Sequence, residues 1–172
     1  MRSTVSQVFG LLLASAVLSF AVNALSPNGI DVIGKYRELS GSEGPIVPPT
    51  AEPDDPPFID INVAQMEHAA GQALFVDARN LEDFECGTIP GSVNLPFEYL
   101  PEGDLAPYFD SVLAAPKDRM LIVFCSGEEC DLSLHLARNL KLQGYTDLAI
   151  FFGGAREWEK FGLDVERRKQ CG

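Results

Sequence analysis

A continuous apolar run at residues 120–124 constrains the fold of this chain more than any other segment. The run, Met-Leu-Ile-Val-Phe, contains no polar residue, which is typical of a central parallel strand that is covered on both faces. A short loop containing Gly127 follows it. A strand, a loop and an amphipathic helix in this order predict a unit of an α/β fold. The helix is expected at 131–143, where one stripe carries Leu132, Leu136, Ala137 and Leu140.

Strand-like and helix-like patterns alternate through the rest of residues 58–168. Asn62 and Gln65 form a capping-box pattern, which predicts a helix that ends at Gly71. The alternation predicts a mostly parallel sheet with helices on both faces, and ligand sites in such folds lie beyond the carboxyl ends of the strands. Further strands are expected at 74–76 and 148–152, with helices at 80–84, at 104–115 and around Trp158.

The first 25 residues form an apolar segment that is expected to be helical, and residues 8–25 carry no charge. Their length lies between that of a signal-peptide core and the roughly 20 residues of a membrane-spanning helix. We expect a single-pass membrane anchor with the domain outside the cytoplasm. The alternative is cleavage near Ala24, which leaves a secreted or periplasmic domain. Residues 26–57 are rich in Pro and Gly and predict a linker, and 169–172 form a tail.

Composition limits the partners of this chain. The formal net charge of -12 repels phosphate backbones, so we expect no nucleic-acid partner. His68 and His135 are the only histidines, and the cysteines show no paired C-x-x-C spacing, so we expect no metal site. His135 is expected to serve packing. We expect that the protein needs no organic cofactor. We also expect that it is a monomer.

Cys125 is the residue best placed for chemistry, because it follows the apolar run directly. Amide groups of a tight loop and the start of a helix favour an anion, and hence a thiolate. Such a thiolate is a nucleophile. The alternative is that Cys125 is a small buried apolar residue at the end of a strand.

Four ordered motifs resemble the rhodanese-like sulfurtransferase family. Residues 74–79 read LFVDAR, residues 84–96 read FECGTIPGSVNLP, residues 122–125 read IVFC, and residues 144–158 run from Gly-Tyr through Gly-Gly to Trp. The resemblance implies that Cys125 carries sulfur as a persulfide. It also implies that the loop amides cradle that sulfur, and the loop consists of Ser126, Gly127, Glu128, Glu129 and Cys130.

The resemblance also implies that Asp77 and Arg79 support the site. The carboxylate is expected to bind loop amides and the guanidinium to pair with an acid such as Glu85. The alternative is that both residues serve the fold alone. Thr88 stands where the family usually has His, a change that we expect to be structural.

The loop departs from the family pattern because no basic residue lies between Cys125 and Ser133. Its carboxylates raise a thiol pKa and repel dianions such as thiosulfate, or else they cap the following helix. Related phosphatases require an arginine where this chain has Asp131, so phosphatase activity is not expected. The acids in the segment are Glu128, Glu129 and Asp131.

We therefore expect a sulfurtransferase of the thiosulfate sulfurtransferase type, which takes sulfur from a donor and passes it to a thiol or another acceptor. One alternative is a non-catalytic rhodanese-like binding or regulatory module tethered at a membrane. Another is a redox protein that uses Cys125 with Cys130, since a pair within one loop can also form a disulfide or resolve a persulfide. Cys86 and Cys171 give no comparable indication.

Overall fold

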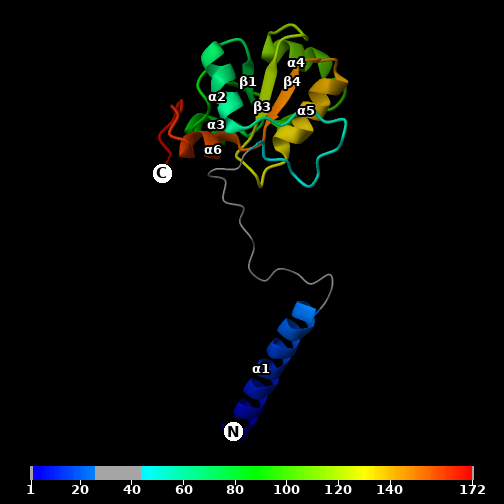
Figure 1. The fold of residues 1–172 in the computed structure, drawn as a ribbon, viewed down its shortest axis with the longest axis vertical. Helices are drawn as coiled ribbons and strands as arrows, with labels where there is room; N and C mark the ends of the chain where they lie inside the picture. Colours follow the sequence, from blue (N-terminus) through cyan, green and yellow to red (C-terminus); the bar gives the residue numbers. More distant parts are fainter. Residues whose placement is uncertain (1, 26–43, 172) are drawn as a thin grey trace. The chain divides into compact units, whose positions relative to one another are not determined.

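Four parallel strands form the sheet at the centre of the C-terminal part of the chain (Figure 1). The computed structural model describes residues 2–25 and 44–171. The spatial order of the strands is β2-β1-β3-β4, which places the apolar strand β3 in the interior of the sheet as expected. The strands are β1 (Leu74–Asp77), β2 (Val93–Asn94), β3 (Leu121–Phe124) and β4 (Leu148–Phe151).

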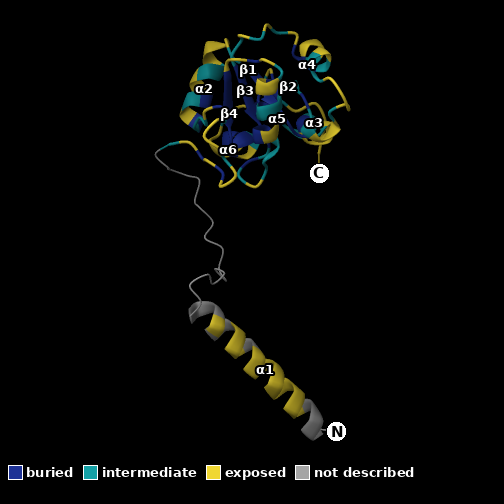
Figure 2. Ribbon diagram, turned by 90° about the vertical axis from the view of Figure 1, so that its right-hand side faces the viewer, coloured by how far each residue is buried: buried dark blue, intermediate teal, exposed yellow. Residues whose placement is uncertain are grey.

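The register aligns the carboxyl ends of the strands. Val76 of β1 lies opposite both Val93 of β2 and Val123 of β3, and Val123 lies opposite Ile150 of β4. Every residue of β1, β3 and β4 is buried, as the continuous apolar runs predict (Figure 2). The residues that follow β1 and β3 therefore meet at one edge of the sheet, where a parallel fold places its ligand site.

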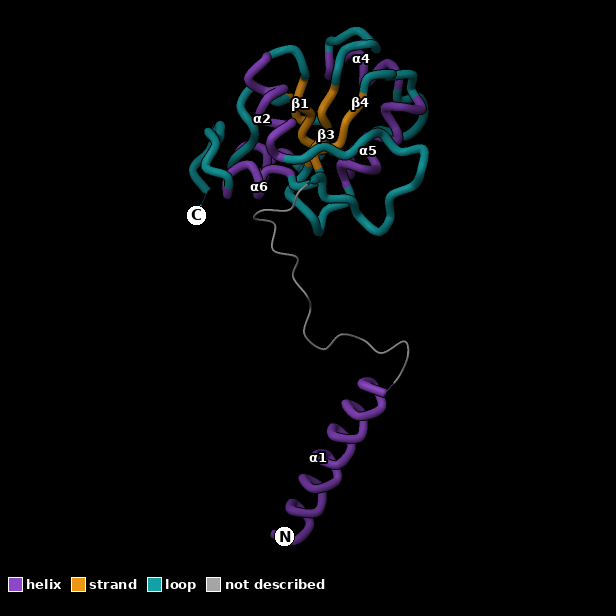
Figure 3. Tube along the Cα trace, viewed as in Figure 1, coloured by secondary structure: helices purple, strands orange, loops and turns teal. Residues whose placement is uncertain are grey.

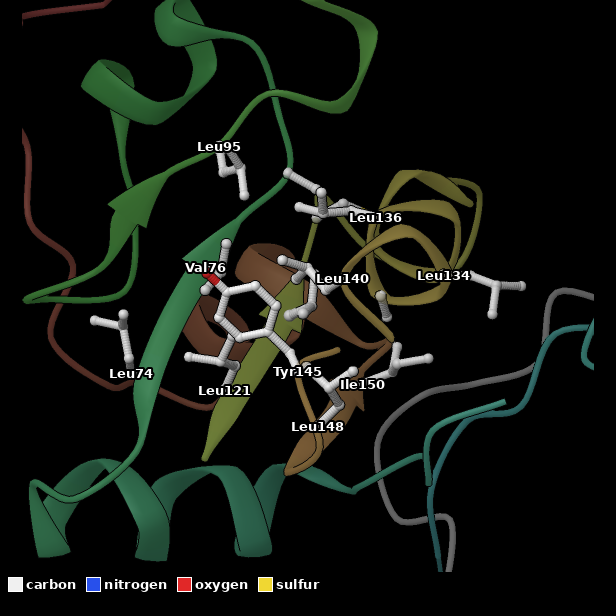
Figure 4. Close-up of a cluster of buried hydrophobic side chains, with 14 of the residues drawn as sticks. Leu74, Val76, Leu95, Leu121, Leu134, Leu136, Leu140, Tyr145, Leu148 and Ile150 are labelled. Atoms are coloured by element: carbon white, nitrogen blue, oxygen red, sulfur yellow. The ribbon is translucent and has the colours of Figure 1, made fainter. Parts of the chain in front are cut away.

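Helices cover both faces of the sheet (Figure 3). Alternate strand residues point to opposite faces, so Val123 packs with α4 and α5, whereas Ile122 packs with α2 and α6. Figure 4 shows the first of these clusters, in which Leu136 and Leu140 of α5 face the strands. The helices are α2 (Ile61–Ala70), α3 (Leu81–Cys86), α4 (Ala106–Leu113), α5 (Leu132–Leu142) and α6 (Gly154–Lys160), with the 3-10 helix η1 (Phe97–Tyr99).

The start of α2 differs from the sequence prediction. Asp60, not Asn62, caps the helix, and its carboxylate accepts hydrogen bonds from the amides of Asn62 and Val63 at 2.9 and 3.0 Å. An acid in this position satisfies amides that have no partner within the helix. The predicted end is confirmed, because Gly71 adopts a left-handed conformation with φ of 68°.

The N-terminal unit, Met1–Glu38, contains the expected helix α1 (Arg2–Leu25). Side chains described along this helix, such as Phe9 and Leu12, are exposed. Within the described residues, no helix is long and apolar enough to cross a membrane. The structure thus gives the expected anchor no support, and the location of the protein stays a prediction.

Residues 44–57 belong to the predicted linker, yet they contact the domain. Asp55 accepts two hydrogen bonds from Arg138 of α5, at 2.6 Å from Nε and 2.9 Å from Nη2. The amide of Ile150 in β4 donates to the carbonyl of Pro57 at 2.9 Å. Ile46 is buried in the core on the α5 side of the sheet. This stretch therefore packs along the domain.

A disulfide joins Cys86, at the end of α3, to Cys171 near the carboxyl end of the chain. The two residues are 85 positions apart, and their Cα atoms lie 5.5 Å apart. Backbone hydrogen bonds from Arg168 and Lys169 to the carbonyl of Glu85 hold the same region. The C-terminal residues are thereby fastened to α3.

Candidate active site

Cys125 lies directly after β3, at the edge of the sheet where the site is expected, and none of its surface is exposed. Its thiol donates a hydrogen bond to the carbonyl of Cys130, with 2.6 Å between sulfur and oxygen. The hydroxyl of Ser133, in the first turn of α5, donates to the same sulfur at 3.6 Å. The sulfur is therefore enclosed by polar groups of its own loop and helix.

The first turn of α6 holds the loop in place. The amide of Ala155 donates to the carbonyl of Cys125 at 2.9 Å, and the amide of Arg156 donates to that of Ser126 at 3.0 Å. Gly154 permits this approach, because a Cβ atom there would lie 2.3 Å from the carbonyl oxygen of Cys125. Its φ of 63° also lies in the left-handed region. The Gly-Gly motif, Gly153 and Gly154, therefore lets α6 approach the reactive loop, which consists of residues 126–130.

The two cysteines of the loop hydrogen-bond to each other, and their pKa values move in opposite directions. The hydrogen bond to Cys130 and burial raise the pKa of Cys125. The same hydrogen bond, amides of Ser126 and Leu132, and the charge of Arg79 lower the pKa of Cys130 to about 6, against the opposing effect of burial. Within the pair, the thiolate is therefore favoured at Cys130 and disfavoured at Cys125.

This arrangement differs from the sequence expectation in one respect. Amides of Ser126 and Leu132 lower the pKa of Cys130, whereas the backbone of Gly127 lowers that of Cys125. The position of an amide donor depends on the local turn, here fixed by Gly127 with φ of 150° and by a hydrogen bond from the Cys130 amide to the Gly127 carbonyl. Binding of transferred sulfur by the loop residues stays a prediction.

Asp77 and Arg79 form a buried ion pair with each other. Arg79 Nε and Nη2 donate to the two carboxylate oxygens of Asp77 at 2.9 and 2.6 Å, and Nη2 also donates to the carbonyl of Gly87 at 2.7 Å. Arg79 therefore does not pair with Glu85, its expected partner. Asp77 accepts from the backbone amide of Arg79 rather than from the reactive loop.

Thr88 completes this ion pair, a role that the sequence did not reveal. Its hydroxyl donates to Asp77 at 2.8 Å, and its side chain is buried. A hydroxyl can donate one hydrogen bond to the Asp77 carboxylate. Threonine can therefore stand here in place of the histidine that is usual in the family. The only sequence signal was the departure from the family pattern at this position.

Acidic residues of the loop and of the neighbouring elements act on one another. Burial raises the pKa of Glu157 in α6, and the charges of Asp60 and Glu128 raise it further. The Asp131 side chain makes no capping hydrogen bond to α5, and it instead accepts a hydrogen bond from the Thr50 hydroxyl at 3.3 Å. Capping therefore does not account for Asp131.

His135 packs as expected. Its ring stacks on Phe97 of η1 with 5.5 Å between the ring centroids. It lies on α5, after the reactive loop, and no contact joins it to the sulfur of Cys125 in the described structure.

Comparison with known proteins agrees with this fold. The chain is 35% identical over 97 residues to the thiosulfate:glutathione sulfurtransferase of Homo sapiens, and this match covers 52% of the chain and 82% of the relative. The BH2092 protein from Bacillus halodurans superposes with a TM-score of 0.52 at 22% identity, covering 63% of this chain and 75% of that one. Thiosulfate sulfurtransferase from Pseudomonas aeruginosa gives 0.55 at 22%, covering 67% of this chain and 21% of that one.

The two solved structures share the fold. The sulfurtransferase relative supports sulfurtransferase activity at the level of the family, and with it a sulfur donor and a sulfur acceptor as general classes of partner. A model of the rhodanese-like domain matches residues 62–161, more than half of the sequence. The chain therefore belongs to the rhodanese-like domain family.

Proposed function

We propose that this protein is a sulfurtransferase that carries sulfane sulfur as a persulfide on Cys125. The observation that carries the proposal is the position of Cys125 directly after β3, where its sulfur contacts the carbonyl of Cys130 and the hydroxyl of Ser133. Cys125 becomes the nucleophile when its thiol loses its proton. Ser133 donates a hydrogen bond that stabilises the resulting anion.

Sulfur transfer then proceeds in two displacements. The thiolate of Cys125 attacks the sulfane sulfur of a donor, a new sulfur-sulfur bond forms, and the donor group leaves with the electron pair of the broken bond. An acceptor thiolate then attacks the outer sulfur, and Cys125 leaves as a thiolate. Because the sulfur is fully buried, both steps require residues 126–130 to move away from it.

Acidic residues near the loop bear on the substrate class. The charges of Asp60 and Glu128 both act on Glu157, and acidic groups disfavour a small dianion. A low-molecular-weight thiol carrying sulfane sulfur, or a polypeptide, suits the site better. Arg79 is held in the interior by Asp77, and its positive charge acts on Cys130.

Intact-mass analysis after incubation with a sulfane-sulfur donor tests the proposal. The wild type and the variants Cys125→Ser and Cys130→Ser are each compared with and without an organic persulfide as donor. The expected result is sulfur addition in Cys130→Ser, and no addition in Cys125→Ser. No addition to any form would instead favour the binding module, to which the full burial of Cys125 also points. A Cys125–Cys130 disulfide that forms without donor would favour the redox protein.

A further inference from the structure

The loop holds two thiols, only one of which the transfer reaction needs as a sulfur carrier. Cys125 and Cys130 are the free cysteines of the described chain, since Cys86 and Cys171 are joined to each other. Cys125 donates to the backbone carbonyl of Cys130, and the two side chains share a hydrogen bond. The sulfur of Cys130 is thus already in contact with the sulfur that would carry the persulfide.

The surroundings of Cys130 suit a nucleophile. Amides of Ser126 and Leu132 reach its sulfur, and Arg79 contributes positive charge. A pKa of about 6 makes this thiol predominantly a thiolate at neutral pH. Thiols whose pKa lies near the ambient pH attack disulfide-type sulfur most effectively, because they combine thiolate content with intrinsic nucleophilicity.

We infer that Cys130 is the resolving thiol of the site, which displaces hydrosulfide from the persulfide of Cys125 and closes a Cys125–Cys130 disulfide. This inference rests on the proposed function. The Cys130 thiolate attacks the inner sulfur, the bond between the inner and outer sulfur breaks, and the outer sulfur leaves with the electron pair as hydrosulfide. The outer sulfur is reduced and the Cys130 thiolate is oxidised. Two equivalents of a low-molecular-weight thiol then reduce the disulfide and form their own disulfide.

Burial favours this internal route over an external acceptor. Cys125 is fully buried, so an external thiolate reaches it only after the loop moves, whereas Cys130 is half-buried in the same loop and already contacts Cys125. A thiol tethered within one short loop acts at an effective concentration on the order of millimolar or higher. The protein would therefore release hydrosulfide even when external thiol is scarce.

A single-turnover experiment without external thiol and without oxygen tests this inference. The protein receives one equivalent of an organic persulfide, and hydrosulfide and intact mass are followed together. The wild type is expected to release hydrosulfide and to become lighter than the reduced protein by two hydrogen atoms. Cys130→Ser and Cys130→Ala, loaded to completion first, are expected to retain the added sulfur and to release hydrosulfide at least about tenfold more slowly, given the lost effective concentration.

The outcomes separate the two proposals. If the Cys130 variants take up no sulfur although circular dichroism shows them folded, the proposed function itself fails. If wild type and both variants hold the added sulfur equally long, the resolving role is overturned while sulfur transfer stands. A donor-free sample of the wild type controls for direct oxidation, and disulfide formation there at the same rate would also overturn the inference.

Discussion

Arg79 holds both carboxylate oxygens of Asp77 in the interior of the domain, through Nε at 2.9 Å and Nη2 at 2.6 Å. The charge of Arg79 also lowers the pKa of Cys130. A single ammonium group cannot reproduce the planar, two-point geometry of this pair. Loss of Arg79 would therefore affect both the stability of the fold and the pKa of Cys130.

Arg79→Ala is expected to lower the free energy of unfolding by about 3–5 kcal/mol, because it leaves the Asp77 carboxylate buried without its partner. Urea denaturation measures this change. The matched control is Arg167→Ala, which removes an exposed arginine paired with Glu159 and should change stability by less than about 1 kcal/mol. Equal effects of the two substitutions would contradict the role assigned to Arg79.

Gly154→Ala is expected to destabilise the protein by about 2–5 kcal/mol, since the new Cβ meets the Cys125 carbonyl and the left-handed backbone is strained. Gly71 serves as a control, because it is also left-handed but has no atom within 4 Å of its ideal Cβ. Gly71→Ala should therefore lose only about 1–2 kcal/mol. Thermal unfolding compares them, and a similar loss in both would show that contact with the reactive loop is unimportant.

Reduction of the Cys86–Cys171 disulfide is expected to lower stability by about 4–5 kcal/mol, from the chain entropy released by a loop of this length. Denaturation of Cys86→Ser beside wild type gives the value. Cys130→Ser removes a thiol that takes part in no disulfide and should leave this contribution intact. An unchanged midpoint in Cys86→Ser would mean that the C-terminal segment adds nothing to the stability of the domain.

Alkylation by a neutral reagent should follow a pKa of about 6 at Cys130. The rate is expected to rise as the pH increases through 6, because deprotonation produces the thiolate. In Cys125→Ser the thiol donor that contributes most to this lowering is replaced, so the midpoint should move to higher pH. Peptide mapping assigns the modified cysteine. A midpoint near the ordinary value of about 8.5 in the wild type would contradict the account.

The same shift has a consequence for stability. The folded-state pKa of Cys130 lies below its unfolded value of about 8.5, so the unfolded chain binds more protons between these values. Stability from this group is therefore fully present above about 8.5 and is lost as the pH falls through 6. The difference between wild type and Cys130→Ser across this interval isolates the effect.

The sequence predicts the sheet well because its signals are local. The apolar run at 120–124 identified the buried strand β3, and the stripe on 131–143 identified α5. Gly71 ended α2 where expected, because a left-handed residue after a helix strongly favours glycine. Ordered motifs then gave the family, and with it the position of Cys125 at the edge of the sheet.

Contacts between distant segments were not predictable from these patterns. Cys86 and Cys171 meet only because the fold brings the end of α3 to the carboxyl end of the chain. The binding of Asp55 by Arg138 likewise joins a segment of the predicted linker to α5. Within the site, the sequence placed both cysteines in one loop, but it did not reveal that amides of Ser126 and Leu132 lower the pKa of Cys130.

The central claim is that transferred sulfur resides on Cys125. Fragment mass spectrometry of Cys130→Ser after loading with an organic persulfide locates the added sulfur most directly, because the resolving step is then blocked. The account predicts one additional sulfur atom on the peptide that contains Cys125, and none in the double variant that also carries Cys125→Ser. Sulfur on another residue, or an unmodified Cys125 in folded protein after prolonged exposure to donor, would contradict it.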